Sequence, residues 1–252
     1  PISFANSSSI TANTITVTGT ATGAAEWNQG VFFSGTSSIK ATGTGSSVIS
    51  GISSSTAGAI NSAVVFNDGS TVTLDAGTGN LTVQGTHTVN GYGGIRFGAN
   101  GGSSTNPSLT TRGNVTLGTQ DTNNASLNAS FMLRNGLITA DTGSLTIKGQ
   151  GTGTGINFYD SYGVIKSNGG SSISLNGVAT SSGHGVLVTG NQIGTLNSGG
   201  DVTITGTSSG TGNSGVNFNG GNVRVFGNNV TINGTANTAS GQPSMSVTKG
   251  AP

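Results

Sequence analysis

Seven carboxylates and two imidazoles are the side chains that could perform acid–base or metal chemistry in this chain, which has no cysteine thiol. An enzyme that cleaves glycosidic bonds holds two carboxylates close together. No two acids are adjacent here, and the two that share a phase of the repeat described below, Asp75 and Asp141, lie two coils apart, at about 10 Å. The acids are Glu26, Asp68, Asp75, Asp121, Asp141, Asp160 and Asp201. We therefore predict no enzyme.

The two histidines, His87 and His184, are about three coils apart, which is too far for a shared zinc or copper ion. The tripeptide Gly183-His184-Gly185 also occurs in the polygalacturonases, but the Asn-Thr-Asp, Asp-Asp and Arg-Ile-Lys partners of that family are absent. No calcium nonapeptide and no phosphate-binding loop is present. The sequence therefore predicts neither a metal site nor a cofactor.

Four aromatic residues are candidates for ligand contact because they lie in or near segments longer than a simple bend: Trp27, Tyr92, Tyr159 and Tyr162. The long segments are residues 21–30, 98–112, 120–130 and 159–163. Insertions in solenoids map to surface loops that often bind partners, so these aromatics could contact a glycan or a protein. They could equally pack on their own loops, as amphipathic aromatic rings do.

Seven glycosylation sequons occur, at Asn6, Asn80, Asn114, Asn124, Asn128, Asn229 and Asn233. Those at Asn80, Asn114 and Asn229 arise directly from a turn followed by an apolar–Thr strand, so the repeat alone explains much of the number.

Composition excludes several classes of protein. Only 6% of the residues are charged and the formal net charge is +1, which gives no electrostatic footprint for nucleic acid. The longest apolar run, Ala63 to Phe66, is far shorter than the roughly 20 residues of a membrane span. The many Gly, Ser, Thr and Asn residues could signal disorder, but the apolar residues recur in short alternating runs, which indicates strands.

An internal repeat organises these runs. Its first block, apolar–Thr–apolar, begins at Ile15, Val48, Leu81, Val115, Leu145, Ile173, Val202 and Val230, at spacings of 28 to 34 residues. A second block lies between successive copies and begins at Val31, Val64, Ile95, Phe131, Ile156, Val186 and Val216. A weaker third block begins at Ile39, Val72, Ile138, Ile165 and Val223, and is blurred in residues 98–112 and 190–199.

Three short strands per unit predict an all-β, right-handed parallel β-helix of about eight coils, each of roughly 30 residues. Three apolar faces enclose one interior, and stacking at about 4.8 Å gives a rod of roughly 35–40 Å. We expect an inner aromatic ladder of Phe33, Phe66, Phe97, Phe158 and Phe218. We expect an outer ladder of Thr16, Thr82, Thr116, Thr146, Thr203 and Thr231. An ice-binding threonine lattice is a weak alternative, because Gln84, Gly118, Lys148 and Asn176 interrupt it.

The runs GNLTVQGT, GNVTLGT, GDVTITGT and NNVTINGT resemble the repeats of filamentous haemagglutinin-like and high-molecular-weight bacterial adhesins. The resemblance covers roughly residues 10–240. It implies a long β-helix outside the cell, delivered by two-partner secretion or as an autotransporter passenger. The family's N-terminal secretion motifs are absent, and Asn106-Pro107-Ser108-Leu109, which comes near one of them, lies mid-chain. We therefore expect residues 1–252 to form a single internal segment, with 240–252 as the start of a further coil or a linker.

The favoured function is structural and adhesive: a rigid stalk at the bacterial surface that displays binding loops. Its partners would be glycans or proteins of a host or neighbouring cell, with no nucleic acid bound and no insertion of this segment in a membrane. Two alternatives stay open. One is a self-assembling extracellular filament or sheath subunit with end-to-end association of copies, and the other is a carbohydrate-active β-helix enzyme of the tailspike or lyase type.

Overall fold

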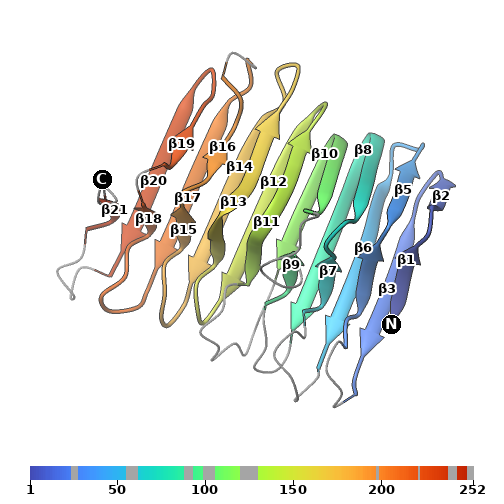
Figure 1. Cartoon of the computed structure of the whole chain (residues 1–252), viewed down its shortest axis with the longest axis horizontal. Coiled ribbons are helices and arrows are strands. Elements are labelled where there is room, and N and C mark those ends of the chain that lie inside the picture. Colours follow the sequence, from blue (N-terminus) through green and yellow to red (C-terminus); the bar gives the residue numbers. More distant parts are fainter. Residues whose placement is uncertain are drawn as a thin grey trace.

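The computed structural model describes residues 1–23, 28–54, 62–87, 93–98, 106–119, 130–196, 199–220, 222–237 and 243–248. These residues form strands and bends with no helix, and the strands join in one 21-stranded sheet (Figure 1). Every pairing is parallel, between strands one coil apart in the chain. Because the described residues contain no helix, none of them forms an apolar helix of membrane-spanning length. The architecture is the parallel β-solenoid that the repeat predicts.

Each coil supplies one strand to each of three stacked columns. The phenylalanine column comprises β1 (Ile2–Ala5), β4 (Val31–Ser34), β7 (Val64–Phe66), β9 (Ile95–Phe97), the first parts of β11 (Phe131–Ala140) and β13 (Ile156–Ser167), β15 (Val186–Thr189), β18 (Val216–Asn219) and β21 (Met245–Thr248). The middle column comprises β2 (Ser8–Ala12), β5 (Thr36–Ala41), the first parts of β8 (Thr71–His87) and β10 (Ser108–Thr119), the last parts of β11 and β13, β16 (Gln192–Ile193) and β19 (Arg224–Val225).

The threonine column completes the coil. It comprises β3 (Thr16–Ala21), β6 (Ser46–Ser53), the last parts of β8 and β10, β12 (Ser144–Gly151), β14 (Ser172–Ala179), β17 (Val202–Ser208) and β20 (Val230–Ala236). Its eight strands are joined by about seven turns of chain, slightly fewer than the eight coils expected.

Alternation places one side of every strand in a continuous apolar interior. In β14, for example, Ile173 and Leu175 are buried while Ser174 and Asn176 lie on the outside. Since equivalent residues stack one coil apart, each apolar side chain contacts its counterparts above and below as well as the other two columns.

The inner aromatic ladder is shorter than expected and begins earlier. Phe4, Phe33, Phe66 and Phe97 stack face to face, with ring centroids 4.9, 4.7 and 4.2 Å apart. Leu133 then takes the next position, and Phe131 meets Phe97 at a tilt. The expected members Phe158 and Phe218 are buried, but an aliphatic residue separates each of them from the ladder, so the stack belongs to the first coils only.

Two blocks of the repeat have a different register from the one the sequence suggests. In the second coil the inward residues are Ser47 and Ile49, while Val48 faces outward between Thr16 and Thr82 and interrupts the threonine ladder. The prediction that Val48 begins the copy is therefore wrong by one residue. The cause is a polar residue inside, since the buried Ser47 hydroxyl accepts a hydrogen bond from the Ile15 amide at 3.1 Å.

The third block also differs. Ile39 stacks on Leu74 rather than on Val72, and Val225 rather than Val223 stacks on Ile193. The two segments that look blurred in the sequence contain ordinary strands of this column, at residues 108–111 and 192–193. Ser and Thr occupy several inward positions of the middle column, so apolar residues alone do not mark its register.

A row of glycines occurs at the same position in seven of the eight strands of the threonine column. In the threonine column one inward position holds Gly19, Gly51, Gly85, Gly149, Gly177, Gly206 and Gly234. At each of them the chain entering the phenylalanine column crosses so closely that a Cβ atom would overlap its backbone carbonyl; at Gly177 that carbonyl belongs to Gly185. The exception is β10, which has Thr119 in place of the glycine; Thr119 pairs with Gly85 of the preceding coil.

We predict that Gly177→Ala destabilises the fold by about 1–3 kcal/mol or more, because the backbone of the next column cannot easily move away. Gly118→Ala is the matched control: it lies in the same column but faces outward, where the nearest atom, Thr116 Cγ2, is 3.9 Å from the new Cβ. Chemical denaturation followed by circular dichroism measures both. Equal stability of the two variants would contradict the crossing constraint.

Candidate functional site

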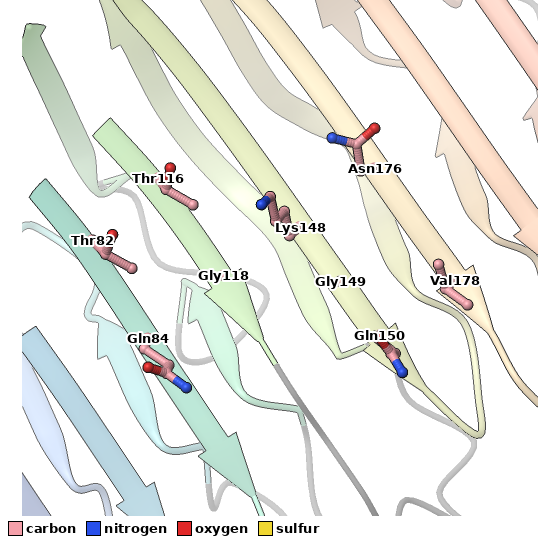
Figure 2. A pocket seen from close by; sticks show the side chains of 9 residues that line it. All are labelled: Thr82, Gln84, Thr116, Gly118, Lys148, Gly149, Gln150, Asn176 and Val178. Carbon is pink, nitrogen blue, oxygen red and sulfur yellow. The ribbon is translucent and has the colours of Figure 1, made fainter. Parts of the chain in front are cut away.

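The outward surface of the threonine column, here called the threonine face, is a ladder of polar side chains with one notch. Along one row of this face Gln84, Gly118, Lys148 and Asn176 follow each other on successive coils. Gly118 presents no side chain, so a gap lies between Gln84 and Lys148 (Figure 2). Its Cβ position is open to solvent, in contrast to the crossing glycines.

The backbone ladder opens beside this notch. The pairing of β10 with β12 ends at Gly118 and Lys148, and among the described residues none joins Thr119 to Gly149. Between β12 and β14 the pairing continues three residues further, to Gly151 and Ala179. The break coincides with Thr119, which occupies the position where the other coils carry the crossing glycine. The notch and the end of the pairing therefore lie at two neighbouring residues of one coil, Gly118 and Thr119.

Together the notch and the opening form an open groove of about 410 Å³, here called the Gly118 groove. Its lining residues are Thr82, Gln84, Thr116, Gly118, Lys148, Gly149, Gln150, Asn176 and Val178, from four successive strands of the threonine column. These described residues present hydroxyl, amide and ammonium groups and the apolar Val178, and none of them carries a carboxylate, an imidazole or an aromatic ring. Such a surface can hold a ligand through hydrogen bonds and one positive charge.

Of the four expected aromatic contact residues, Tyr159 is the one whose side chain the structure describes, and it is not among the residues that line this groove. Trp27 and Tyr92 lie outside the described residues, and so does the side chain of Tyr162, whose backbone pairs with Asn135. Tyr159 is 52% exposed, and the guanidinium carbon of Arg134 lies 5.7 Å from its ring centroid. This geometry is a cation–π contact between neighbouring coils.

The described carboxylates at the edge of the middle column form a ladder of alternating charge. Asp75 stacks between Lys40 and Arg112 on neighbouring coils, and Arg112 Nε donates to Asp141 Oδ2 at 3.0 Å. The Asn168 amide also donates to Asp141, and these hydrogen bonds, with the charge of Arg112, lower the pKa of that carboxyl. Asp75 and Asp141 are two coils apart, as expected, with an arginine between them.

The five described sequon asparagines are all exposed, and two take part in contacts between coils. Asn114 Oδ1 accepts a hydrogen bond from the Ser144 hydroxyl at 2.9 Å. Asn229 Nδ2 donates to Asp201 Oδ1 at 2.9 Å, and this bond and others from Asn229 and Asn228 lower the pKa of Asp201. These contacts give the asparagines a structural reason to occupy the bends. Asn6, Asn80 and Asn233 are the other three, while Asn124 and Asn128 lie outside the described residues.

The histidine of the Gly-His-Gly tripeptide connects two coils. His184 Nδ1 accepts a hydrogen bond from the Ser214 amide at 3.0 Å, so a neutral ring carries its hydrogen on Nε2. Nε2 lies 3.1 Å from the Asn217 side-chain amide, whose buried oxygen has no partner as placed. Turning that amide by half a rotation brings its oxygen to Nε2, which then donates its hydrogen to an acceptor. No group of three or more potential metal ligands occurs among the described residues.

We predict that the fold loses stability in mild acid because His184 is neutral in the folded chain and becomes protonated more readily in the unfolded chain. Burial lowers the pKa of His184 below its ordinary 6.5, and a proton on Nδ1 would oppose the Ser214 amide. The unfolded chain then binds more protons than the folded chain, so stability is full above pH 6.5 and falls below it, by up to about 1.4 kcal/mol per pH unit.

Chemical denaturation of the wild type and of His184→Gln between pH 7.5 and about pH 5 tests this, since comparing the two cancels the other titrating groups. The variant should be less stable at pH 7.5 and should have a shallower slope. Parallel slopes would contradict the assignment.

Comparisons with family models, curated proteins and solved structures found no match to the chain. The Gly118 groove is also absent from the sequence-based candidates, which were aromatic residues in loops. Its signal was nevertheless visible, because Gly118 is the member of its row that has no side chain and Thr119 interrupts the glycine row.

Proposed function

We propose that this chain is a structural and adhesive segment of a large secreted bacterial surface protein, in which a rigid solenoid stalk holds binding surfaces away from the cell. The observation that supports the proposal is the stacking of the three columns, in which each strand pairs with its equivalents one coil away. A solenoid of this kind gains length by adding coils without rebuilding its core, which suits a spacer.

The sequence supports the same proposal. The repeat runs resemble those of filamentous haemagglutinin-like adhesins, and the chain has no cysteine, which suits secretion of an unfolded chain through a pore. The polar threonine face offers hydrogen-bonding groups over eight strands and carries the Gly118 groove. Adhesion needs only such a surface, held rigidly and accessible to a partner.

We expect antibodies raised against the 252-residue chain to label intact source cells, with immunogold particles along fibres that extend from the surface. Electron microscopy measures the distance of each particle from the membrane. Antibodies against a ribosomal protein serve as the control for intact cells. Labelling that appears only after permeabilisation would contradict a surface role.

A filament or sheath subunit is the second candidate, favoured by the likeness of β3 and β20. Register pairs followed from coil to coil place Thr231, Ile232 and Gly234 at positions equivalent to Thr16, Val17 and Gly19. The two strands are therefore compatible with stacking between copies, and exposed Val230 and Met245 accompany β20 and β21.

If copies stack in this way, the mass measured by light scattering should rise with protein concentration, and Ile232→Lys should abolish the rise because it places a charge among inward side chains. Thr231→Lys, on the outward face of the same strand, should associate like the wild type. A wild-type chain that stays monomeric at every concentration excludes this candidate.

A further inference from the structure

We propose that the Gly118 groove binds a linear polysaccharide that carries carboxylate groups, with its chain lying along the solenoid axis across the coils of Gln84, Gly118, Lys148 and Asn176. The proposal rests on the adhesive function above and names the ligand class for one site on the stalk.

The first argument is shape. The lining residues come from four successive strands, so the groove runs across the strands and along the axis. Gln84 and Asn176 are three coil steps apart, about 14 Å at the usual strand spacing. At the missing side chain of Gly118 a ligand can approach the backbone of β10 and lie between Gln84 and Lys148 (Figure 2). An extended polymer fits such a groove better than a compact ligand.

The second argument is chemistry. The side-chain amides of Gln84, Gln150 and Asn176 each offer a donor and an acceptor, and the hydroxyls of Thr82 and Thr116 do the same. Sugar hydroxyls need both kinds of partner. Val178 is the one large apolar side chain among the lining residues, so an extended peptide would find no pockets for apolar side chains. The lining therefore favours a glycan over a peptide.

The third argument is charge. The threonine column consists of β3, β6, β12, β14, β17, β20 and the last parts of β8 and β10, and among its described outward positions Lys148 carries the one formal charge. The exposed Asp201 directly precedes β17 and is not among the residues that line the groove. It stands at the edge of the notch, where an ammonium group attracts a carboxylate as a point charge. The described acids Asp75 and Asp141 lie at the edge of the middle column, outside the groove lining. A uronate-type sugar at the notch complements the positive charge of Lys148.

Isothermal titration calorimetry of the purified 252-residue chain tests the proposal with two probes that share a backbone: a linear hexamer of mannuronate and the neutral mannose hexamer of the same linkage. We expect the mannuronate hexamer to bind, with an affinity that falls as salt is raised, and the neutral hexamer to bind at least tenfold more weakly. Lys148→Gln should remove both the preference and the salt dependence.

Gly118→Gln should fill the notch and weaken binding by tenfold or more, while the open Cβ position lets the fold persist. Thr18→Gln is its matched control, because it adds the same side chain to the same row on the first coil, outside the groove. Thermal melts by circular dichroism check that all variants fold.

Three results would overturn the proposal: no binding of the mannuronate hexamer at millimolar concentration, equal binding of both hexamers, or unchanged affinity in a folded Gly118→Gln variant. None of these results would contradict the proposed stalk function, because surface labelling of source cells does not depend on this groove. Failure of that labelling, in turn, would leave the calorimetry unaffected.

Discussion

The close crossing of backbone over backbone at the end of each threonine-column strand is the constraint on which the solenoid depends. In seven of the eight strands a glycine at this position leaves room for the carbonyl of the chain that enters the phenylalanine column. The three apolar faces can meet in one narrow interior only when this corner is tight. β10 shows the effect of relaxing it, since Thr119 in place of the glycine coincides with the break in pairing to β12 and with the Gly118 groove.

Side-chain ladders along the edges help to align neighbouring coils, but they contribute little to the free energy of folding. The alternation of Lys40, Asp75, Arg112 and Asp141 places opposite charges on neighbouring coils, so a slip by one coil would bring like charges together. The Arg112–Asp141 pair is solvent-exposed, and such pairs contribute little to stability. Hydrogen bonds lower the pKa of Asp141, a member of this ladder, and of Asp201, which lies before β17 and accepts hydrogen bonds from Asn228 and Asn229 on the next coil. The interior supplies the stability, and the edges select the alignment.

The sequence predicted the solenoid because its alternation and its period are properties of the backbone geometry, which every coil repeats. All seven copies of the second block were placed in register, since their inward residues are large and apolar. Prediction failed where a small polar residue faces inward, as Ser47 does, because a buried hydroxyl can pair with a backbone amide and looks like a surface residue in the sequence. The Gly118 groove was not predicted for a related reason. It arises where Gly118 has no side chain, and in a chain with 46 glycines the sequence alone does not distinguish this glycine from the others.

The origin of the groove in two neighbouring residues has an evolutionary consequence. Gly118 and Thr119 differ from their counterparts in adjacent coils, yet the inward Val115 and Leu117 of the same strand keep their places in the core. A recognition site can therefore arise, vanish or move along the rod by point substitution in a single coil, with the scaffold unchanged. In a long array of such coils, selection could place several sites of different specificity at chosen intervals, each inherited independently of the others.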